Sequence, residues 1–130
     1  MDKDRLIAVL QSDPRIQAAV LFGSQAAGYA DENSDIDVAV LYASSPDPIE
    51  KLKFQELLSE EMKQQVDLVS LNEASPILAM QVVKNGSLLY VLDPRAYAEF
   101  EVRLITDYAD LKRLLEPFEK SLLERDLHDR

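Results

Sequence analysis

The sequence predicts an α/β domain in which a small β-sheet is flanked by helices and followed by a long C-terminal helix. Three observations support this fold class. Short apolar runs of strand length alternate with longer segments in which apolar residues recur at helical spacing. Capping residues followed by proline mark the starts of several of these longer segments. Near the C-terminus, one apolar stripe continues from residue 97 to residue 118.

The first half of the chain is expected to form a helix, two strands and a second helix. Residues 4–11 predict a short helix, which the following Ser-Asp-Pro would stop. The apolar runs QAAVLF at residues 17–22 and IDVAVLY at residues 36–42 predict buried strands. The next helix would start near SPDP at residues 45–48, and apolar residues recur in it roughly at helical spacing as far as Met62.

The second half adds two strands before the long helix. QVDLVSL at residues 65–71 has strand character with one conspicuous acid, Asp67. A Ser N-cap at residue 75, followed by Pro, opens a helix that Asn-Gly at residues 85–86 would close. SLLYVL at residues 87–92 predicts the fourth strand.

An apolar stripe predicts the long C-terminal helix, and Asp93 followed by Pro94 marks its start. Along roughly 35 Å of helix at ~1.5 Å per residue, apolar residues recur at steps of three or four: Tyr97, Phe100, Leu104, Tyr108, Leu111, Leu115 and Phe118. Pro117 is expected to kink or end this helix and leave a charged tail. The stripe is expected to face the core. Contact of this helix with a partner or with a second copy is the alternative, because further apolar residues lie outside the stripe: Val102, Ile105, Leu114, Leu122 and Leu123.

Composition narrows the class of protein. The 130 residues contain no repeat or linker, so one domain over residues 1–130 is expected. A formal net charge of -10, without a Lys and Arg cluster, argues against nucleic-acid binding. The lack of cysteine and the single histidine, His128, exclude zinc–thiolate sites and His-based triads. Neither a signal peptide nor a membrane-length apolar stretch is visible, so a cytoplasmic protein without membrane association is expected.

The segment GSQAAGYADENSDID at residues 23–37 carries four acids in its last seven residues, between two predicted core strands. A solvated turn is the plain interpretation of such a loop. However, Asp35 and Asp37 are separated by one residue, so in an extended chain their carboxylates would share one face, with Cα atoms about 6–7 Å apart. Beside the apolar residues of the strand, their repulsion would be costly unless a cation lay between them.

An EF-hand-like calcium loop is a second interpretation, because Asp31, Asn33 and Asp35 have its opening spacing. It fails because Ile36 stands where the loop needs Gly, and Tyr42 stands where it needs Glu. Calcium binding of that kind is therefore not expected.

Gly23 and Ser24 give the third interpretation. A Gly-Ser at the end of a buried strand exposes backbone N–H groups and a hydroxyl that suit phosphate oxygens, and Gly lets a ligand approach the backbone closely. Together with the Asp pair, it predicts a phosphate-binding turn that faces a metal-binding carboxylate pair. Mg²⁺ fits this arrangement, because it binds through one or two carboxylates together with substrate phosphates.

The Gly-Ser, the ten residues after it and the Asp-x-Asp resemble the signature of nucleotidyltransferases related to DNA polymerase β. The wider sequence LFGSQAAGYADENSDIDVAVLY, residues 21–42, is similar to the minimal nucleotidyltransferases, or MNT proteins, and in particular to the MNT antitoxins paired with HEPN ribonuclease toxins. The resemblance implies a polymerase β-like fold with a small mixed sheet. It also implies that Gly23 and Ser24 hold the nucleotide phosphates and that Asp35 and Asp37 bind Mg²⁺.

In such proteins a third carboxylate from a neighbouring strand usually completes the metal site and acts as the base. Asp67 is the acid in a comparable setting here. An edge-strand acid facing water is the alternative for Asp67, whereas an acid on a core strand would need a partner. The chain departs from many relatives at residues 25–27, Gln-Ala-Ala, where they carry Arg, so the cation for the triphosphate is not identified. Gly28 does match the family.

The resemblance implies a Mg²⁺-dependent protein adenylyltransferase that transfers AMP from ATP to a hydroxyl, expected to be a tyrosine, of a cognate HEPN toxin and so neutralises it. The absence of a second, substrate-binding domain fits a protein acceptor that supplies the rest of the site. Two alternatives remain: an antitoxin that acts by binding alone, and a nucleotidyltransferase with a small-molecule acceptor. The long helix is the candidate contact in a homo-oligomer or in a hetero-oligomer with the toxin.

Overall fold

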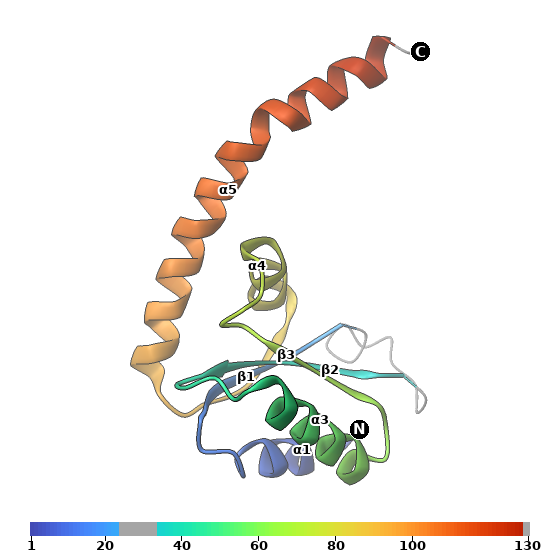
Figure 1. Ribbon diagram of the computed structural model, residues 1–130, viewed down its shortest axis with the longest axis vertical. Helices are drawn as coiled ribbons and strands as arrows, with labels where there is room; N and C mark the ends of the chain where they lie inside the picture. Colours follow the sequence, from blue (N-terminus) through green and yellow to red (C-terminus); the bar gives the residue numbers. More distant parts are fainter. Residues whose placement is uncertain (24–33, 129–130) are drawn as a thin grey trace.

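The computed structural model describes residues 1–23 and 34–128 (Figure 1). In this part of the chain a four-stranded sheet has the strand order β3-β2-β1-β4. The strands are β1 (Ile16–Phe22), β2 (Ile36–Tyr42), β3 (Val66–Ser70) and β4 (Ser87–Val91). The helices are α1 (Lys3–Leu10), α3 (Pro48–Met62), α4 (Pro76–Asn85) and α5 (Pro94–His128).

The sheet is mixed, as expected. β1 pairs antiparallel with both β2 and β4, whereas β2 and β3 are parallel. A parallel pair needs a crossover connection, and α3 supplies it between β2 and β3. β2 has the predicted bounds, residues 36–42, and the other strands agree with their predicted ranges to within one residue at each end.

Helices cover both faces of the sheet and build two buried clusters (Figure 1). On one face α1 and α3 pack on alternate residues of the central strands, with Leu6, Leu58 and Val38 fully buried. On the other face α4 and the start of α5 pack on the intervening residues, among them Ala39 and Val82. Because successive side chains of a strand point to opposite faces, the nearly continuous apolar strands β1 and β2 serve both clusters.

The predicted helix starts are confirmed by their caps. The Asp47 carboxylate accepts a hydrogen bond from the Glu50 N–H at the start of α3, with Pro48 in the first turn. The Ser75 hydroxyl accepts one from the Leu78 N–H at the start of α4. Such caps satisfy N–H groups that have no partner within the helix.

Of the two outcomes expected at Pro117, a kink or an end, the structure excludes the end, so the residues after Pro117 are helical and do not form a separate tail. The helix continues through Pro117 to His128, and it curves along its length (Figure 1). Proline removes one helical hydrogen bond and crowds the carbonyl four residues earlier, and bending relieves that crowding. Here Pro117 and its neighbours at residues 116–119 of α5 are exposed.

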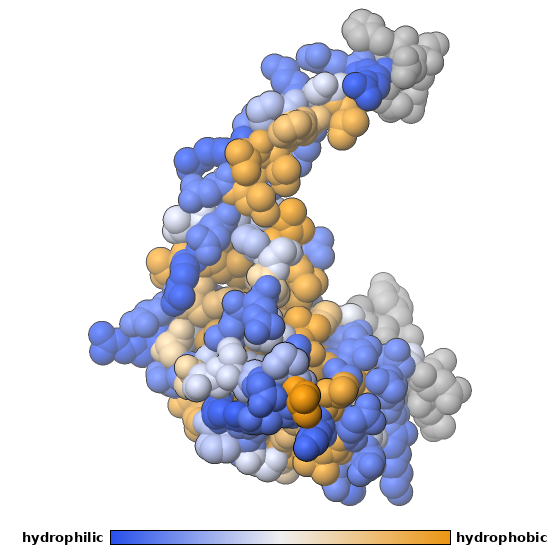
Figure 2. Space-filling model, viewed as in Figure 1, coloured by the Kyte–Doolittle hydropathy of each residue, from blue (hydrophilic) through white to orange (hydrophobic). Residues whose placement is uncertain are grey.

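The apolar stripe of α5 faces the core only along its first part. Leu104 is 6% exposed and belongs to the cluster under α4, whereas Phe118 is 67% exposed. The expectation that the whole stripe faces the core is therefore wrong. Figure 2 shows apolar side chains gathered along the concave side of the outward-reaching half of α5. None of the described helices combines the length and apolar character that crossing a membrane requires.

Candidate active site

Three side chains form a row across the sheet where β1 ends and where β2 and β3 begin. Phe22 pairs with Asp37 in the antiparallel register of β1 and β2, and Asp37 pairs with Asp67 in the parallel register of β2 and β3. All three lie on the sheet face covered by α4 and α5, because they are two residues from Val20, Ala39 and Val69 of that cluster. The fold thus brings together two acids that are far apart in the sequence.

The Asp37 carboxyl lies in an environment that disfavours its charge. Burial is the main cause that raises its pKa, and the negative charges of Asp67 and Asp35 raise it further. A hydrogen bond with the Asp67 side chain acts in the same direction. Two carboxylates that share a site cannot both ionise without cost. This pair therefore gains from an added proton or an added cation.

Gly23 is required by the close approach of β1 to this carboxylate. Its backbone has a φ of +74°, a conformation that favours glycine. A Cβ atom added at Gly23 would collide with Oδ2 of Asp37 and lie 3.2 Å from its Cγ. The predicted glycine thus lies directly beside the predicted metal ligand. Ser24, the other predicted phosphate-binding residue, and Gly28 lie outside the described residues.

Asp35 precedes β2 by one residue, and two hydrogen bonds hold the backbone around it. The Gln64 side-chain amide donates to the Ser34 carbonyl at 2.9 Å, and the Ile36 N–H donates to the Gln65 carbonyl at 2.8 Å. The negative charge of Asp35 is one of the causes that raise the pKa of Asp37. Among the side chains of residues 1–23 and 34–125, no three acidic or histidine groups lie closely enough together to hold a metal ion. The structure therefore joins Asp37 and Asp67 as a pair, and a centre of three carboxylates remains a prediction.

β3 is one of the two edge strands of the sheet, and α3 covers its free side. The Ser59 hydroxyl accepts a hydrogen bond from the Val66 N–H at 3.0 Å, and the Gln55 side chain accepts one from the Leu68 N–H at 2.9 Å. These two bonds flank Asp67 on either side. Asp67 is half-buried and faces Asp37, so the alternative of an edge-strand acid that only faces water is not what the structure shows.

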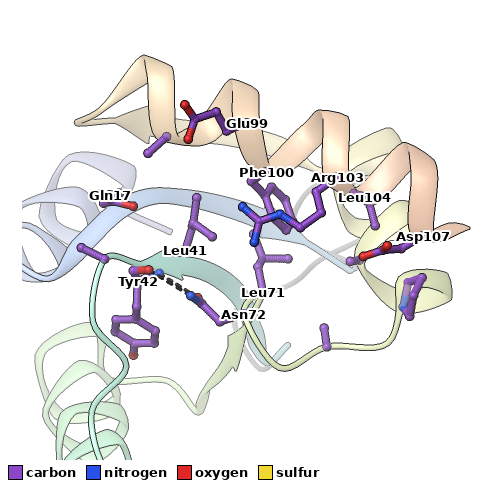
Figure 3. Close-up of a pocket in the computed structure, with 15 residues that line it drawn as sticks. Gln17, Leu41, Tyr42, Leu71, Asn72, Glu99, Phe100, Arg103, Leu104 and Asp107 are labelled. Carbon is purple, nitrogen blue, oxygen red and sulfur yellow. Dashed lines mark hydrogen bonds between the residues drawn. The ribbon is translucent and has the colours of Figure 1, made fainter.

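One cavity lies beside this row and another lies far from it. The first, of about 330 Å³, is lined by Phe22, Gly23, Leu78, Gln81, Val82 and Asn85. The second, of about 390 Å³, lies beyond the opposite end of β2, between Tyr42 and α5 (Figure 3). There the Asn72 amide bonds the backbone of Tyr42 in both directions, and Arg103 reaches over the cavity from α5. The smaller cavity is the one that adjoins this row, at its Phe22 end.

The α4 side of this first cavity was not among the sequence-predicted site residues. Leu78, Gln81, Val82 and Asn85 follow helical spacing and line the cavity together. The sequence signal for this side of the cavity is two amides, Gln81 and Asn85, on a mostly apolar helix. That signal is weak, because surface amides are common on helices of any function.

A mixed sheet with paired acids beside a glycine turn is typical of nucleotidyltransferases. The chain matches the family "polymerase beta, nucleotidyltransferase" over residues 4–95. Since this match covers most of the chain, the protein belongs to that family.

Relatives within the family are more specific. A protein adenylyltransferase MntA of Shewanella oneidensis is 37% identical over 91 residues, which are 69% of this chain and 66% of that protein. A protein adenylyltransferase MntA of Aphanizomenon flos-aquae is 30% identical over 128 residues, which are 91% of this chain and 83% of that protein. The similarity thus extends to curated protein adenylyltransferases as well as to the general fold.

Solved structures agree with these relatives. A crystal structure of a toxin–antitoxin with AMP-PNP contains a chain that superposes with a TM-score of 0.84 at 31% identity, covering 95% of this chain and 99% of that one. A complex of tri-AMPylated Shewanella oneidensis HEPN toxin with MNT antitoxin gives a TM-score of 0.77 at 30% identity, covering 93% of this chain and 95% of that one. The overlap includes most of α5, because the covered share is nearly the whole chain.

Proposed function

We propose that this protein is an antitoxin that acts as a protein adenylyltransferase on a cognate HEPN ribonuclease toxin. It transfers AMP from ATP to a hydroxyl of the toxin, a tyrosine by preference, and the modification neutralises the toxin. The observation that carries the proposal is the pairing of Asp37 with Asp67 directly beside Gly23. The similarity to protein adenylyltransferases over most of the chain supports it.

The reaction assigns a role to each predicted residue. The acceptor oxygen attacks the α-phosphorus of ATP, the bond to the bridging oxygen of the β-phosphate breaks, and pyrophosphate leaves. Asp67 takes the proton of the attacking hydroxyl, because it lies at the outer end of the row, on the edge strand. Gly23 and Ser24 hold the phosphates with backbone N–H groups and a hydroxyl. Positioning of the two reactants supplies much of the rate.

Asp35, Asp37 and Asp67 are proposed to hold Mg²⁺. The donor set fits, because Mg²⁺ prefers carboxylate oxygens and shares its coordination with substrate phosphates. The raised pKa of Asp37 fits as well, because a divalent cation relieves the repulsion within the pair. When bound, the cation neutralises charge on the phosphate groups during transfer.

The outer half of α5 is proposed to hold the toxin. Phe118, Leu122 and Leu123 are all more than 60% exposed, although each is a large apolar side chain. From Leu104 the stripe steps alternately by four and three residues, which is the spacing that packs helix against helix. A helix of the toxin laid along this stripe would bury it. A homo-oligomer through α5 is the competing arrangement.

A transfer assay tests the proposal. The protein is incubated with its cognate toxin, Mg²⁺ and ATP labelled at the α-phosphate, and the toxin is examined by mass spectrometry for added AMP. We expect label on the toxin with the wild-type protein and none with Asp37→Asn. Asp107→Asn, which changes an exposed acid in the same way, is the control and should retain transfer.

The same assay separates the two alternatives. Neutralisation of the toxin by Asp37→Asn at the wild-type dose, without label, would favour an antitoxin that acts by binding alone. Pyrophosphate release that does not depend on the toxin would favour a small-molecule acceptor. Label on the toxin that persists in Asp37→Asn would contradict the assignment of Asp37.

A further inference from the structure

The cavity at the Phe22 end of the row has two kinds of lining. Phe22, Leu78 and Val82 supply apolar walls, and Gln81 and Asn85 supply side-chain amides. Its volume of about 330 Å³ is at the lower end of the range for small-molecule sites, about 300–1,000 Å³. Apolar walls with a few polar groups are the usual composition of such sites.

The two amides are available to a ligand. Gln81 and Asn85 lie one helical turn apart on α4, and both are exposed. Neither side-chain amide is hydrogen-bonded to any other residue in the described part of the chain. The neighbouring Val82 is only 2% exposed, so it anchors this face of α4 against the sheet. The amides are therefore presented on a fixed helix rather than on a loop.

The position of the cavity relative to the acids limits what it can bind. Phe22 lines the cavity and is also the register partner of Asp37, and Gly23 lines it as well. The order along the sheet is thus cavity, Phe22, Asp37 and Asp67. A nucleotide whose phosphates lie at Gly23 and Asp37 would place its other end toward this cavity. The attacking hydroxyl would enter from the Asp67 side.

We propose that this cavity seats the nucleobase of the nucleotide substrate and that Gln81 selects adenine, an inference that rests on the proposed nucleotidyltransferase activity. A side-chain amide offers an acceptor and a donor side by side, which match the amino group and N7 of adenine. Guanine presents two acceptors at the same edge, so the amide cannot satisfy both. The Phe22 ring and Leu78 cover the apolar face of the base.

Kinetics with ATP and GTP test the inference on the complex of full-length protein and toxin. Gln81→Ala should raise the KM for ATP about tenfold, as expected for losing one to two hydrogen bonds, and should leave kcat nearly unchanged. The preference for ATP over GTP should fall by a similar factor. Asn85→Ala tests the second amide in the same way. Gln11→Ala, the same change at an exposed position directly after α1, is the matched control and should have no effect.

Three outcomes overturn the inference. If the wild-type protein transfers AMP but Gln81→Ala and Asn85→Ala behave like Gln11→Ala, the nucleobase binds elsewhere. The proposed function still stands in that case. If Gln81→Ala raises the KM for the toxin instead of the KM for ATP, the cavity serves the acceptor. If the wild-type protein transfers nothing, calorimetry with AMP-PNP decides. Weaker binding by Gln81→Ala then supports the nucleobase site without the activity, and unchanged binding overturns it.

Discussion

The Asp37 carboxylate occupies the space that any side chain at Gly23 would need. The backbone of Gly23, directly after β1, therefore lies against the carboxylate of Asp37, near the start of β2. This contact fixes the distance between the proposed phosphate-binding turn and the proposed metal ligand. It also explains why the glycine cannot be replaced without a change at the acid.

Gly23→Ala tests this contact. Alanine would collide with Asp37 Oδ2 and would also be strained at a φ of +74°, so we expect a loss of stability of about 1–2 kcal/mol. Displacement of the carboxylate should lower the rate of transfer by roughly 100-fold. Urea denaturation and the labelled transfer assay measure the two effects. Wild-type transfer by a folded Gly23→Ala protein would contradict the assigned geometry.

Asp37→Asn should stabilise the metal-free protein at pH 7. Burial, together with Asp67 and Asp35, raises the pKa of Asp37 above its value in the unfolded chain. The folded state then binds more protons than the unfolded state between these two pKa values, so the stability contribution is present at low pH and is lost as pH rises. Asparagine carries no charge and avoids this loss.

The difference in stability between Asp37→Asn and the wild-type protein should therefore shrink as the pH falls toward about 4, the ordinary pKa range of an aspartate. Thermal unfolding in a chelator between pH 4 and pH 8 measures it. Asp107→Asn, at an exposed position, should show no such trend. A wild-type protein that is more stable than Asp37→Asn at pH 7 would count against the buried, repelled carboxylate.

Mg²⁺ should raise the stability of the wild-type protein in proportion to its binding. At 100 times its dissociation constant, a ligand that binds only the folded state stabilises it by about 2.7 kcal/mol. The rise should vanish in Asp37→Asn and in Asp67→Asn, because each variant lacks one of the paired carboxylates. Urea denaturation with and without Mg²⁺ measures this. An equal rise in all variants would place the cation elsewhere.

The side chains of α3 that cover β3 should matter for stability and for the placement of Asp67. Ser59→Ala leaves the Val66 N–H of the edge strand without its partner, which should cost about 1–3 kcal/mol. Ser121→Ala, at an exposed position on α5, is the matched control. Unfolding midpoints in urea give the comparison, and equal midpoints for the two variants would show that water replaces the hydroxyl.

Leu122→Asp should separate toxin binding from folding. Leu122 is 62% exposed, so the unfolding midpoint should change little, whereas affinity for the toxin should fall by at least about 30-fold. Lys120→Ala changes the net charge by the same amount on the opposite side of α5 and should bind normally. Calorimetry measures both affinities. Loss of self-association, with toxin binding intact, would indicate the homo-oligomer instead.

Much of this fold could be predicted from the sequence because its local signals agree with its packing. The strand at residues 36–42 is apolar on both faces, and the structure buries both faces under helices. Ser75 and Asp47 cap helices because their side chains satisfy the free N–H groups. Asp67 could be singled out because an isolated acid in an apolar strand needs a partner.

Other features could not be predicted, because they depend on tertiary placement. A proline in a helix pattern signals either a kink or an end, and the sequence does not decide between them, whereas the structure shows that α5 continues past Pro117. The contribution of α4 to the cavity depends on how that helix lies across the end of β1. No spacing in the sequence links Gln81 to Phe22.

The parallel pairing of β2 and β3 has a consequence for sequence drift. Insertions in the connection at residues 43–47, before α3, would leave both strands and their alignment intact. One added residue within Val66–Ser70 ahead of the acid would instead turn Asp67 toward the layer of α1 and α3. Relatives that keep the transfer activity should therefore differ in the length of the connection at residues 43–47. They should not differ in the number of residues of β3 ahead of the acid.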